Sequence, residues 1–426
     1  MHPLMRSRLR GLFLPDESWR RNRLAINIAA ALVFSGFTFV MPFLPLYVKE
    51  LGIKDEANIA TWAGLLLTIA PLLASLLAPA WGRIGDRYGM KLMIERCVLA
   101  LAVHWALLGL AQNVYHILAL RVALGLVGGF ATLSMPLLVS STPREHMGQS
   151  IGYLQTVQMV SSAVGPIIGG VLADAIGIRK TCLVSAVLLT LALFVIHRLY
   201  QTPPGAAAAA SGKPGERGIS FKQAAAIPSF WVMIAVLFFV NFVERSFAPI
   251  IPLYVLTLGT SLKNAAKVAG LIISLGLLAE AVSAMVLGHR MKKRPAGRLL
   301  LWRLTGGALL CLPMGLAGSA LQLLVLRLAL GLLAGGCMVV IYTLGSRVIP
   351  QETRATSFSF LASASLLGAA VGPVAAGALA HLSIRAIFFF NSFVFFLLLL
   401  YAAKSIGPAI RAAGAGRPSE DQSSSL

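Results

Sequence analysis

The chain has 426 residues, of which 58% are hydrophobic and only 12% are charged, and its mean hydropathy is +0.82. A water-soluble fold of this size needs more polar side chains to cover its surface, so the composition excludes an ordinary soluble domain. The formal net charge is +21 at pH 7, and the positions of the basic residues decide whether it indicates nucleic acid or a membrane.

Apolar stretches long enough to span a bilayer recur along the whole chain. A helix needs about 20 residues to cross roughly 30 Å of hydrocarbon, where it satisfies its own backbone polar groups. The sequence therefore predicts an all-α membrane protein with twelve transmembrane helices. They are expected at residues 24–48, 62–81, 92–112, 114–140, 151–173, 178–199, 229–256, 265–288, 299–318, 321–345, 356–381 and 384–403.

Most of the 36 Lys and Arg residues fall before the first stretch, in alternate loops or in the tail. With an even number of spans, this asymmetry predicts that both termini are cytoplasmic. We expect a multi-pass protein of the cell membrane, in bacteria the inner membrane, with the lipid bilayer and a small-molecule substrate as its partners. No compact basic module forms a binding face, so no nucleic-acid partner is expected.

The sequence matches itself at an offset of 206 to 207 residues. The segment PFLPLYV at 42–48 returns as PIIPLYV at 249–255, and LRVALGL at 120–126 returns as LRLALGL at 326–332. A repeat of six helices keeps each helix in the same membrane orientation, as in parallel-repeat transporters that bind substrate near the midplane between the halves.

This repeat predicts the domain organisation. An N-terminal six-helix bundle spans 1–200, a soluble cytoplasmic linker spans 201–228, and a C-terminal six-helix bundle spans 229–404. The tail, 405–426, is expected to be disordered.

The loop between the second and third stretches reads GRIGDRYGMK, at 82–91. Glycine permits a tight turn there, and an acidic side chain in it can meet a positive helix N-terminus. The segment resembles the cytoplasmic loop signature of the major facilitator superfamily, and the resemblance covers nearly the whole chain. It implies an inner gate that uses Gly82, Asp86, Arg87, Gly89 and Lys91.

In that family the loop carboxylate latches helix 2 against helix 11, which would begin here near Thr356. The sequence departs from the signature at Met90, where a second base is usual. The alternative interpretation is that the basic residues of the loop only enforce topology.

The fifth stretch carries small residues and a proline in a recurring pattern. Small residues let helices approach closely, and proline bends a helix. The pattern resembles the signature of twelve-helix drug–proton antiporters, with Ser161 where glycine is usual, and this resemblance implies export. Its residues here are Gly152, Gly165, Pro166, Gly169 and Gly170.

Few charged residues fall inside the predicted spans. A charge at the bilayer centre costs about 2.5–3.5 kcal/mol on insertion scales, so these residues are functional candidates. In the first repeat copy Phe37 occupies the place of Glu244 and Ala74 that of Glu280, so the fold itself does not require acid there. The charged residues are Arg121, Glu244, Arg245, Glu280 and Arg327.

A carboxylate that faces a cavity can take up and release a proton as its surroundings change. We expect Glu244 to be the principal proton carrier and Glu280 the second. The alternatives are a fixed ion pair of Glu244 with a buried arginine, and a helix–helix hydrogen bond of Glu280. Arg121 matches an intramembrane arginine that the family links to proton transfer, although its repetition at Arg327 fits a structural role equally well.

A substrate cavity is expected mainly between helices 1, 4, 7 and 10. Aromatic and methionine side chains suit broad hydrophobic specificity because they can repack. The candidate lining residues are Phe37, Tyr47, Met135, Asn241 and Tyr254.

The predicted function is proton-coupled export of hydrophobic or amphiphilic small molecules, that is, multidrug efflux by alternating access, with the protein working as a monomer. The proton gradient would supply the energy, and neither a cofactor nor a metal is expected. One alternative is a carrier for a specific metabolite or siderophore. A membrane receptor or enzyme is a further alternative, but the sequence has no metal-ligand set or nucleophile motif that favours an enzyme.

Overall fold

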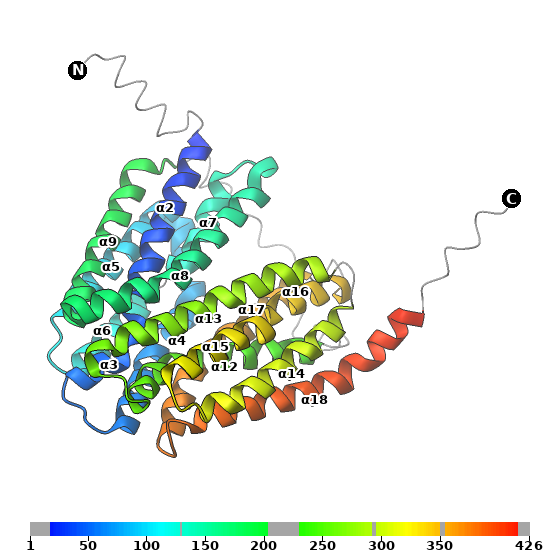
Figure 1. Ribbon diagram of the computed structural model, residues 1–426. Helices are drawn as coiled ribbons and strands as arrows, with labels where there is room; N and C mark the ends of the chain where they lie inside the picture. Colours follow the sequence, from blue (N-terminus) through cyan, green and yellow to red (C-terminus); the bar gives the residue numbers. More distant parts are fainter. Residues whose placement is uncertain (1–17, 128–129, 203–229, 292–294, 350–353, 416–426) are drawn as a thin grey trace, which may run out of the picture. The chain divides into compact units, whose positions relative to one another are not determined.

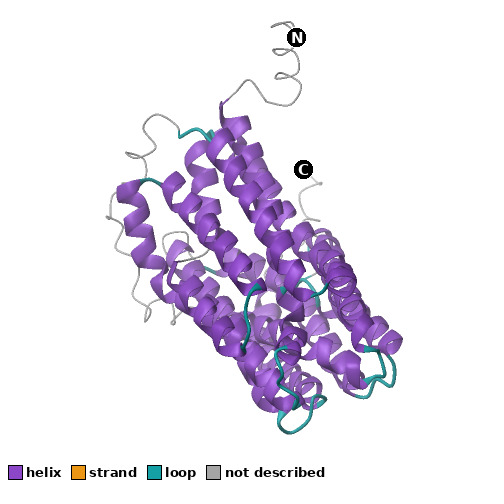
Figure 2. Cartoon of the chain, turned by 90° about the vertical axis from the view of Figure 1, so that its left-hand side faces the viewer, coloured by secondary structure: helices purple, strands orange, loops and turns teal. Residues whose placement is uncertain are grey.

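The computed structural model describes residues 18–127, 130–202, 230–291, 295–349 and 354–415. Within these ranges all the regular elements are helices joined by short loops (Figure 2). The first half contains α2 (Ser18–Thr38), η1 (Met41–Phe43), α3 (Leu44–Glu50), α4 (Glu56–Tyr88), α5 (Met90–Gly109), α6 (Val114–Val127), α7 (Phe130–Ser141), η2 (Arg144–His146), α8 (Met147–Ile176) and α9 (Ile178–Leu199). The second half contains α12 (Phe230–Thr257), α13 (Leu262–Arg290), α14 (Ala296–Gly315), α15 (Ala320–Ala334), α16 (Cys337–Val348), α17 (Arg354–Ala380) and α18 (Ala386–Ala415).

The membrane class predicted from the sequence is confirmed. Among the described residues, 10 helical segments are long and apolar enough to cross a membrane. The two other predicted spans, 114–140 and 299–318, correspond to the α6–α7 pair and to α14. The helices are therefore consistent with the predicted twelve spans.

The repeated proline segment has a different backbone in each copy. In the first copy the chain leaves α2 and continues as η1 and α3, with Pro42 and Pro45 in their first turns. A proline is tolerated at a helix start because its missing N–H has no helical partner there. In the second copy Pro249 and Pro252 lie inside the continuous helix α12. The sequence repeat therefore does not fix the backbone of each copy.

Two of the predicted spans each contain two helices, α6 (to Val127) and α7 (from Phe130), and α15 (to Ala334) and α16 (from Cys337). Residues 128–129 lie outside the described ranges. Between α15 and α16, Gly336 has a φ of 80°, in the left-handed region that glycine adopts readily. The pair Gly335-Gly336 has a sequence equivalent at 128–129.

Contacts divide the chain into two compact units that do not follow the two sequence halves. Unit 1 comprises Met1–Arg217, Ser246–Leu277 and Pro373–Ile384, and unit 2 comprises Gly218–Arg245, Leu278–Gly372 and Arg385–Leu426. In unit 1, α2 packs against α8 and α9, and α5 packs against α9 (Figure 1). In unit 2, α14 packs against α15, α16 and α18. The division into two six-helix bundles stays a prediction.

The predicted linker and tail fall largely outside the described residues. Residues 203–229 and 416–426 are not described. α18 continues to Ala415, beyond the end at residue 403 that hydrophobicity predicted.

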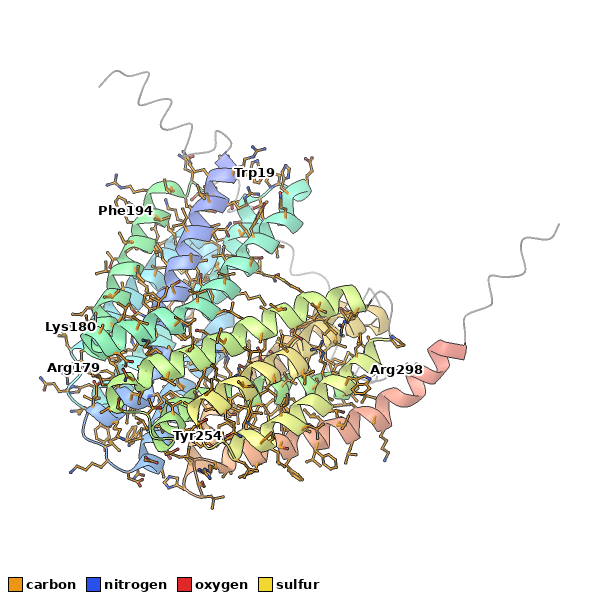
Figure 3. The ribbon with its side chains drawn as sticks, in the orientation of Figure 1. Trp19, Arg179, Lys180, Phe194, Tyr254 and Arg298 are labelled. Atoms are coloured by element: carbon orange, nitrogen blue, oxygen red, sulfur yellow. The ribbon has the colours of Figure 1, made fainter. Side chains whose placement is uncertain are left out.

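Unit 1 has two ends that carry different side chains. Trp19, at the start of α2, and Phe194, in the last turns of α9, lie toward one end, whereas Arg179 and Lys180 lie at the other (Figure 3). We call the end with Arg179 and Lys180 the distal end of unit 1. It also holds the junction between α8 and α9 at Gly177.

Candidate functional site

Two carboxyl groups and one guanidinium group, from three helices of unit 2, meet at one place. Arg327 of α15 donates through Nη2 to Oε1 of Glu244 in α12, as an ion pair. Arg327 Nη1 lies 3.6 Å from Oε1 of Glu280 in α13. Both carboxyl groups therefore lie against the same guanidinium group. We call Glu244, Glu280 and Arg327 the acid cluster.

The acid cluster is buried at its arginine and more open at its acids. The side chain of Arg327 is 2% exposed, whereas those of Glu244 and Glu280 are each 28% exposed. The cluster, with two acids for one arginine, is neutral when it holds one proton. The neighbouring Arg245 is a further cation, and its side chain is exposed.

The side chains next to the acid cluster mix polar and polarizable groups. Asn241 lies one turn before Glu244 on α12, and its side-chain amide donates to the carbonyl oxygen of Leu237 at 2.9 Å. The same nitrogen lies 3.8 Å from the sulfur of Met338 in α16. Asn241 and Met338 are both partly exposed. A predicted cavity residue therefore lies beside the cluster, together with a methionine that the sequence did not single out.

Arg121 occupies the repeat-equivalent position in unit 1 and has a different partner. Its side chain is 1% exposed, and Nη2 donates to the sulfur of Met41 in η1. In the described part of the chain, no carboxylate forms an ion pair with Arg121. The structure therefore gives the predicted intramembrane arginine a neutral partner.

The other predicted cavity residues are all in unit 1. Phe37 and Met135 are partly exposed, and the Phe37 ring packs edge-on against Trp105 with centroids 6.2 Å apart. Tyr47 and Tyr254 are fully buried. The Tyr47 hydroxyl donates to the backbone carbonyl at position 108, 2.8 Å away, and so ties α3 to α5. A role in substrate binding stays a prediction for these residues.

Most of the predicted signature loop is helical: residues 82–88 end α4, Met90 begins α5, and only Gly89 lies between the two helices. Gly82, Asp86 and Arg87 lie in the last turns of α4, and their side chains are outside the described part of the structure. Gly89 has a φ of 92° and immediately precedes α5. This conformation favours glycine, which is the property that the loop motif requires.

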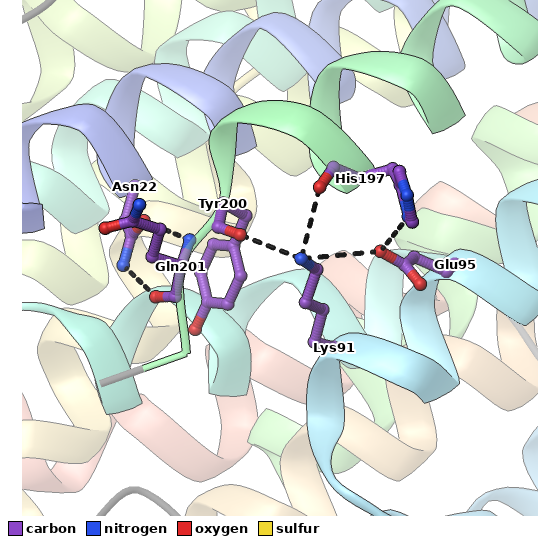
Figure 4. A network of polar contacts seen from close by, with 6 residues as sticks. All are labelled: Asn22, Lys91, Glu95, His197, Tyr200 and Gln201. Atoms are coloured by element: carbon purple, nitrogen blue, oxygen red, sulfur yellow. Dashed lines mark hydrogen bonds and ion pairs between the residues drawn. The ribbon is translucent and has the colours of Figure 1, made fainter. Parts of the chain in front are cut away.

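Lys91, the last residue of the signature, contacts the end of α9 (Figure 4). Its Nζ donates to the carbonyl oxygens of Tyr200 at 2.9 Å and His197 at 3.2 Å, and it lies 3.8 Å from Glu95 Oε1. Glu95 Oε1 is also 3.3 Å from His197 Nδ1. A cation at the C-terminal carbonyls of a helix is favourable. Lys91 therefore joins α5 to α9 within unit 1.

The small residues of α8 allow close helix contact. A methyl group at Gly165 would collide with the Thr38 side chain, and one at Gly169 would collide with the backbone of Phe39. Gly152, by contrast, has no neighbour within 4 Å. The predicted motif thus has a packing role at Gly165 and Gly169 that Gly152 does not share.

Further along α8, the same motif packs against α13 inside unit 1. Gly170 faces the backbone of α13, and Gly270 faces the backbone carbonyl of Pro166. At the distal end, the Asp174 carboxylate accepts a hydrogen bond from the backbone N–H of Lys267 at 2.9 Å. These contacts join the fifth span to the eighth.

An equivalent contact joins α4 to the distal end of α17, also within unit 1. Gly64 faces the backbone of Pro373, and Gly377 faces the backbone of α4. The Oγ1 of Thr61 lies 3.0 Å from Nε2 of His381. Pro373 and His381 are the repeat equivalents of Pro166 and Asp174. The two copies therefore make matching glycine contacts between helices. The polar contact beside them differs, with Asp174 in one copy and His381 in the other.

No group of three or more His, Cys, Asp or Glu side chains within the described ranges could hold a metal ion. The four cysteines, Cys97, Cys182, Cys311 and Cys337, are buried, and none of them forms a disulfide.

Comparison with known proteins assigns the family. The family model described as Major Facilitator Superfamily matches residues 26–321 and 265–425, which together span almost the whole chain. The chain belongs to the major facilitator superfamily. This major facilitator protein is therefore a membrane transporter and not an enzyme, and the resemblance noted in the sequence is confirmed.

Curated relatives of this transporter match over most of their length. It is 31% identical over 392 residues to "Multidrug resistance protein MdtG" of Proteus mirabilis, covering 91% of the chain and 96% of the relative. It is 33% identical over 388 residues to the protein of that name in Yersinia enterocolitica, covering 90% and 93%. A "Multi-drug resistance efflux pump PmrA homolog" of Lactococcus lactis is 31% identical over 374 residues, covering 87% and 91%.

Solved structures share the fold at low sequence identity. A bacterial homologue of the human lysosomal transporter Spinster, described as inward-facing and unoccupied, gives a TM-score of 0.71 at 17% identity, covering 95% of this chain and 99% of that one. The nucleoside transporter NupG gives a TM-score of 0.69 at 10% identity, covering 90% and 99%. At such identities these matches show the major facilitator fold alone.

Sequence reasoning found the members of the acid cluster, and an ion pair of Glu244 with a buried arginine, which the structure shows, was one of its alternatives; it did not place Glu280 beside them. It treated Glu244 and Glu280 as rival proton carriers and Arg327 as one half of a repeated pair. The sequence did contain a signal for the cluster. Glu244 and Glu280 occur only in the second copy, whereas Arg327 has an equivalent in the first. Sequence reasoning missed Met338 because an isolated methionine in an apolar helix is indistinguishable from core packing.

Proposed function

We propose that this transporter exports hydrophobic or amphiphilic small molecules in exchange for protons, and that the acid cluster carries the proton. The observation that carries the proposal is the meeting of Glu244, Glu280 and Arg327 at one place in unit 2. The drug-resistance names of the relatives support the substrate class.

The chemistry of the cluster suits exchange of one proton for substrate. With one proton bound, the two carboxyl groups and the guanidinium group together carry no net charge. Loss of that proton leaves two carboxylates to compete for one arginine, and like charges close together repel. A cationic substrate group beside the partly exposed acids would relieve this repulsion, and proton return would displace it. We propose Glu244 as the principal carrier in this scheme and Glu280 as its partner.

Substrate would bind beside the cluster. Asn241 offers a polar group and Met338 a polarizable one, and both are partly exposed. Phe37, Tyr47, Met135 and Tyr254 are proposed as further substrate contacts, which substitution of each residue would test. Methionine and aromatic surfaces accept ligands of varied shape because they repack at small cost.

Alternating access requires gates on both sides of this site. We propose that the glycine-lined contacts of α8 with α13, and of α4 with α17, form the outer seal. Small residues allow such helices to meet closely and to separate without breaking salt bridges. The signature loop, with Asp86, Arg87 and Lys91, is proposed as the inner gate, and Arg121 as a structural anchor whose part in proton transfer is open to test.

The orientation follows from the basic loops: both termini in the cytoplasm, in the inner membrane of a bacterial cell. We propose that the protein works as a monomer and does not bind nucleic acid. A reporter fused after Lys213 should be cytoplasmic, and one fused near Lys263 should be outside. The opposite result would overturn the orientation.

The decisive experiment measures transport into inverted membrane vesicles with a chemically diverse panel of substrates, with and without an imposed proton gradient. We expect accumulation of several unrelated amphiphilic compounds only when the gradient is present. Equal accumulation with and without the proton gradient would contradict the exchange mechanism. Transport confined to one metabolite or siderophore would instead favour a specific carrier.

A further inference from the structure

The interruption between α15 and α16 leaves backbone carbonyls in need of partners. α15 ends at Ala334, and the left-handed Gly336 stops its helical pattern before α16 begins. The last carbonyls of a helix have no N–H partner within that helix. In an apolar environment each unpartnered carbonyl is costly, so a donor from another helix is required.

Arg303 of α14 supplies that donor. Its Nη1 donates to the carbonyl oxygens of Leu332, at 2.6 Å, and Leu333, at 3.3 Å. The same nitrogen donates to Oγ of Ser283 in α13, and Ser283 Oγ donates in turn to the Leu332 oxygen at 2.7 Å. Arg303 is 8% exposed. One buried guanidinium group thus fastens α13 and α14 to the end of α15.

The fastened region includes two of the three helices that carry the acid cluster, α13 and α15. Ser283 follows Glu280 by three residues on α13 and so lies on nearly the same helix face. The α15–α16 interruption lies directly against Glu280, because a Cβ at Gly335 would fall 2.9 Å from Glu280 Cα and 3.0 Å from its Cγ. Arg327 belongs to the same helix, α15, whose end Arg303 holds. The relative position of Glu280 and Arg327 therefore depends on contacts that converge at Arg303.

We propose that Arg303 is a positioning residue that sets the geometry of the acid cluster, by holding α13 against the end of α15 through Ser283 and the carbonyls of Leu332 and Leu333. This inference rests on the proposed proton-coupled function. Arg303 forms no hydrogen bond with either carboxyl group; it acts through α13, which carries Glu280, and α15, which carries Arg327.

The first repeat copy contains the same device without the acids. Arg96 is the repeat equivalent of Arg303, and its Nη2 donates to the carbonyl oxygen of Val127, the last residue of α6, at 2.7 Å. Trp81 supplies the second donor, from Nε1 to the carbonyl at position 126 at 3.0 Å, and its ring lies 3.6 Å from the Arg96 guanidinium carbon. Ala74 stands there in the place of Glu280. Arg96 is therefore a matched control for Arg303.

The test compares Arg303→Lys with Arg96→Lys in the full-length protein, reconstituted in liposomes with one amphiphilic substrate of the wild type. Lysine keeps the charge, but its side chain is shorter and lacks the rigid planar guanidinium group that holds Nη1 against its three acceptors. We expect Arg303→Lys to move the pH midpoint of substrate–proton exchange by about half a unit or more, while substrate affinity at the optimal pH changes little. Arg96→Lys should leave the midpoint unchanged, whatever its effect on the rate.

Ser283→Ala provides a second, milder variant if Arg303→Lys does not fold. It removes the link to α13 but leaves Arg303 on the two carbonyls, so a smaller midpoint shift in the same direction is expected. An unchanged midpoint in Arg303→Lys, or in Ser283→Ala if Arg303→Lys is unfolded, would overturn the positioning role. Equal shifts in Arg96→Lys and Arg303→Lys would overturn it as well. If wild-type transport itself showed no proton dependence, the proposed function would fail. If wild-type transport is proton-dependent but the variants keep its midpoint, only the positioning role of Arg303 fails.

Discussion

The two repeat copies contain an equivalent arginine, but its interaction partners differ between the copies. Arg121 is buried in unit 1 and donates to a methionine sulfur, whereas Arg327 is buried in unit 2 and holds two carboxyl groups. The sequence around both arginines is nearly the same, at 120–126 and 326–332. An arginine at this place is therefore compatible with a neutral partner, and the acids are an addition of the second copy. We infer that proton coupling is concentrated in the C-terminal half.

The largest effect should come from removing the titratable group nearest to Arg327. In Glu244→Gln we expect gradient-driven accumulation to fall to the level of vesicles without protein, while substrate still binds. Glutamine keeps the volume and the hydrogen bonding but cannot exchange a proton. Substrate addition to the purified variant should no longer release protons, which a pH-sensitive dye measures.

Glu280→Gln is the matched variant of the same cluster, and we expect a partial loss. Full pH-dependent exchange in Glu244→Gln combined with loss in Glu280→Gln would invert the ranking of the two acids. Retention in both variants would show that the proton is carried elsewhere.

The arginines themselves offer the second test. Arg327→Gln leaves two acids without their cation, and removing one partner of a buried ion pair costs about 3–5 kcal/mol of stability. Arg121→Gln loses a contact to a thioether and should cost only about 1 kcal/mol. Thermal unfolding in detergent measures both. Equal destabilisation by the two variants would contradict the asymmetry between the copies.

A third comparison concerns the signature loop, where the second copy has Lys292 in the place of Asp86. In Asp86→Asn we expect slower transport with normal membrane insertion, because the neutral side chain weakens the inner latch but keeps its shape. The ratio of transport rate to the amount of inserted protein is the measurement. A wild-type rate would support the alternative that the loop only enforces topology.

The smallest effect is expected at the distal end of unit 1. Asp174→Asn should weaken the hydrogen bond to the Lys267 backbone and raise the accessibility of a cysteine placed at position 267 to a membrane-impermeant thiol reagent, by roughly a factor of two to five, as for a loss of about 0.5–1 kcal/mol. Labelling of the same cysteine in a His381→Ala background serves as the control, since His381 closes the other helix contact. A greater change in the control would show that α4 and α17 dominate the seal.

The sequence alone determined the class of the protein, the positions of most spans, the repeat and the family, because these depend on local hydrophobicity and on short motifs. It also predicted a tight turn that glycine permits, and the structure has a positive φ at Gly89. Each of these features can be read from a few neighbouring residues, since helices in a bilayer satisfy their hydrogen bonds within one segment.

Only the tertiary structure decided which buried charges meet. Nothing in the spacing of Glu244, Glu280 and Arg327 along the chain specifies that α12, α13 and α15 bring them together. It also decided that the proline segment breaks the first copy but not the second, and that Arg303 fastens the end of α15. The physical reason is that helix–helix packing depends on the shapes of side chains distant in sequence, so identical local motifs acquire different partners and different roles.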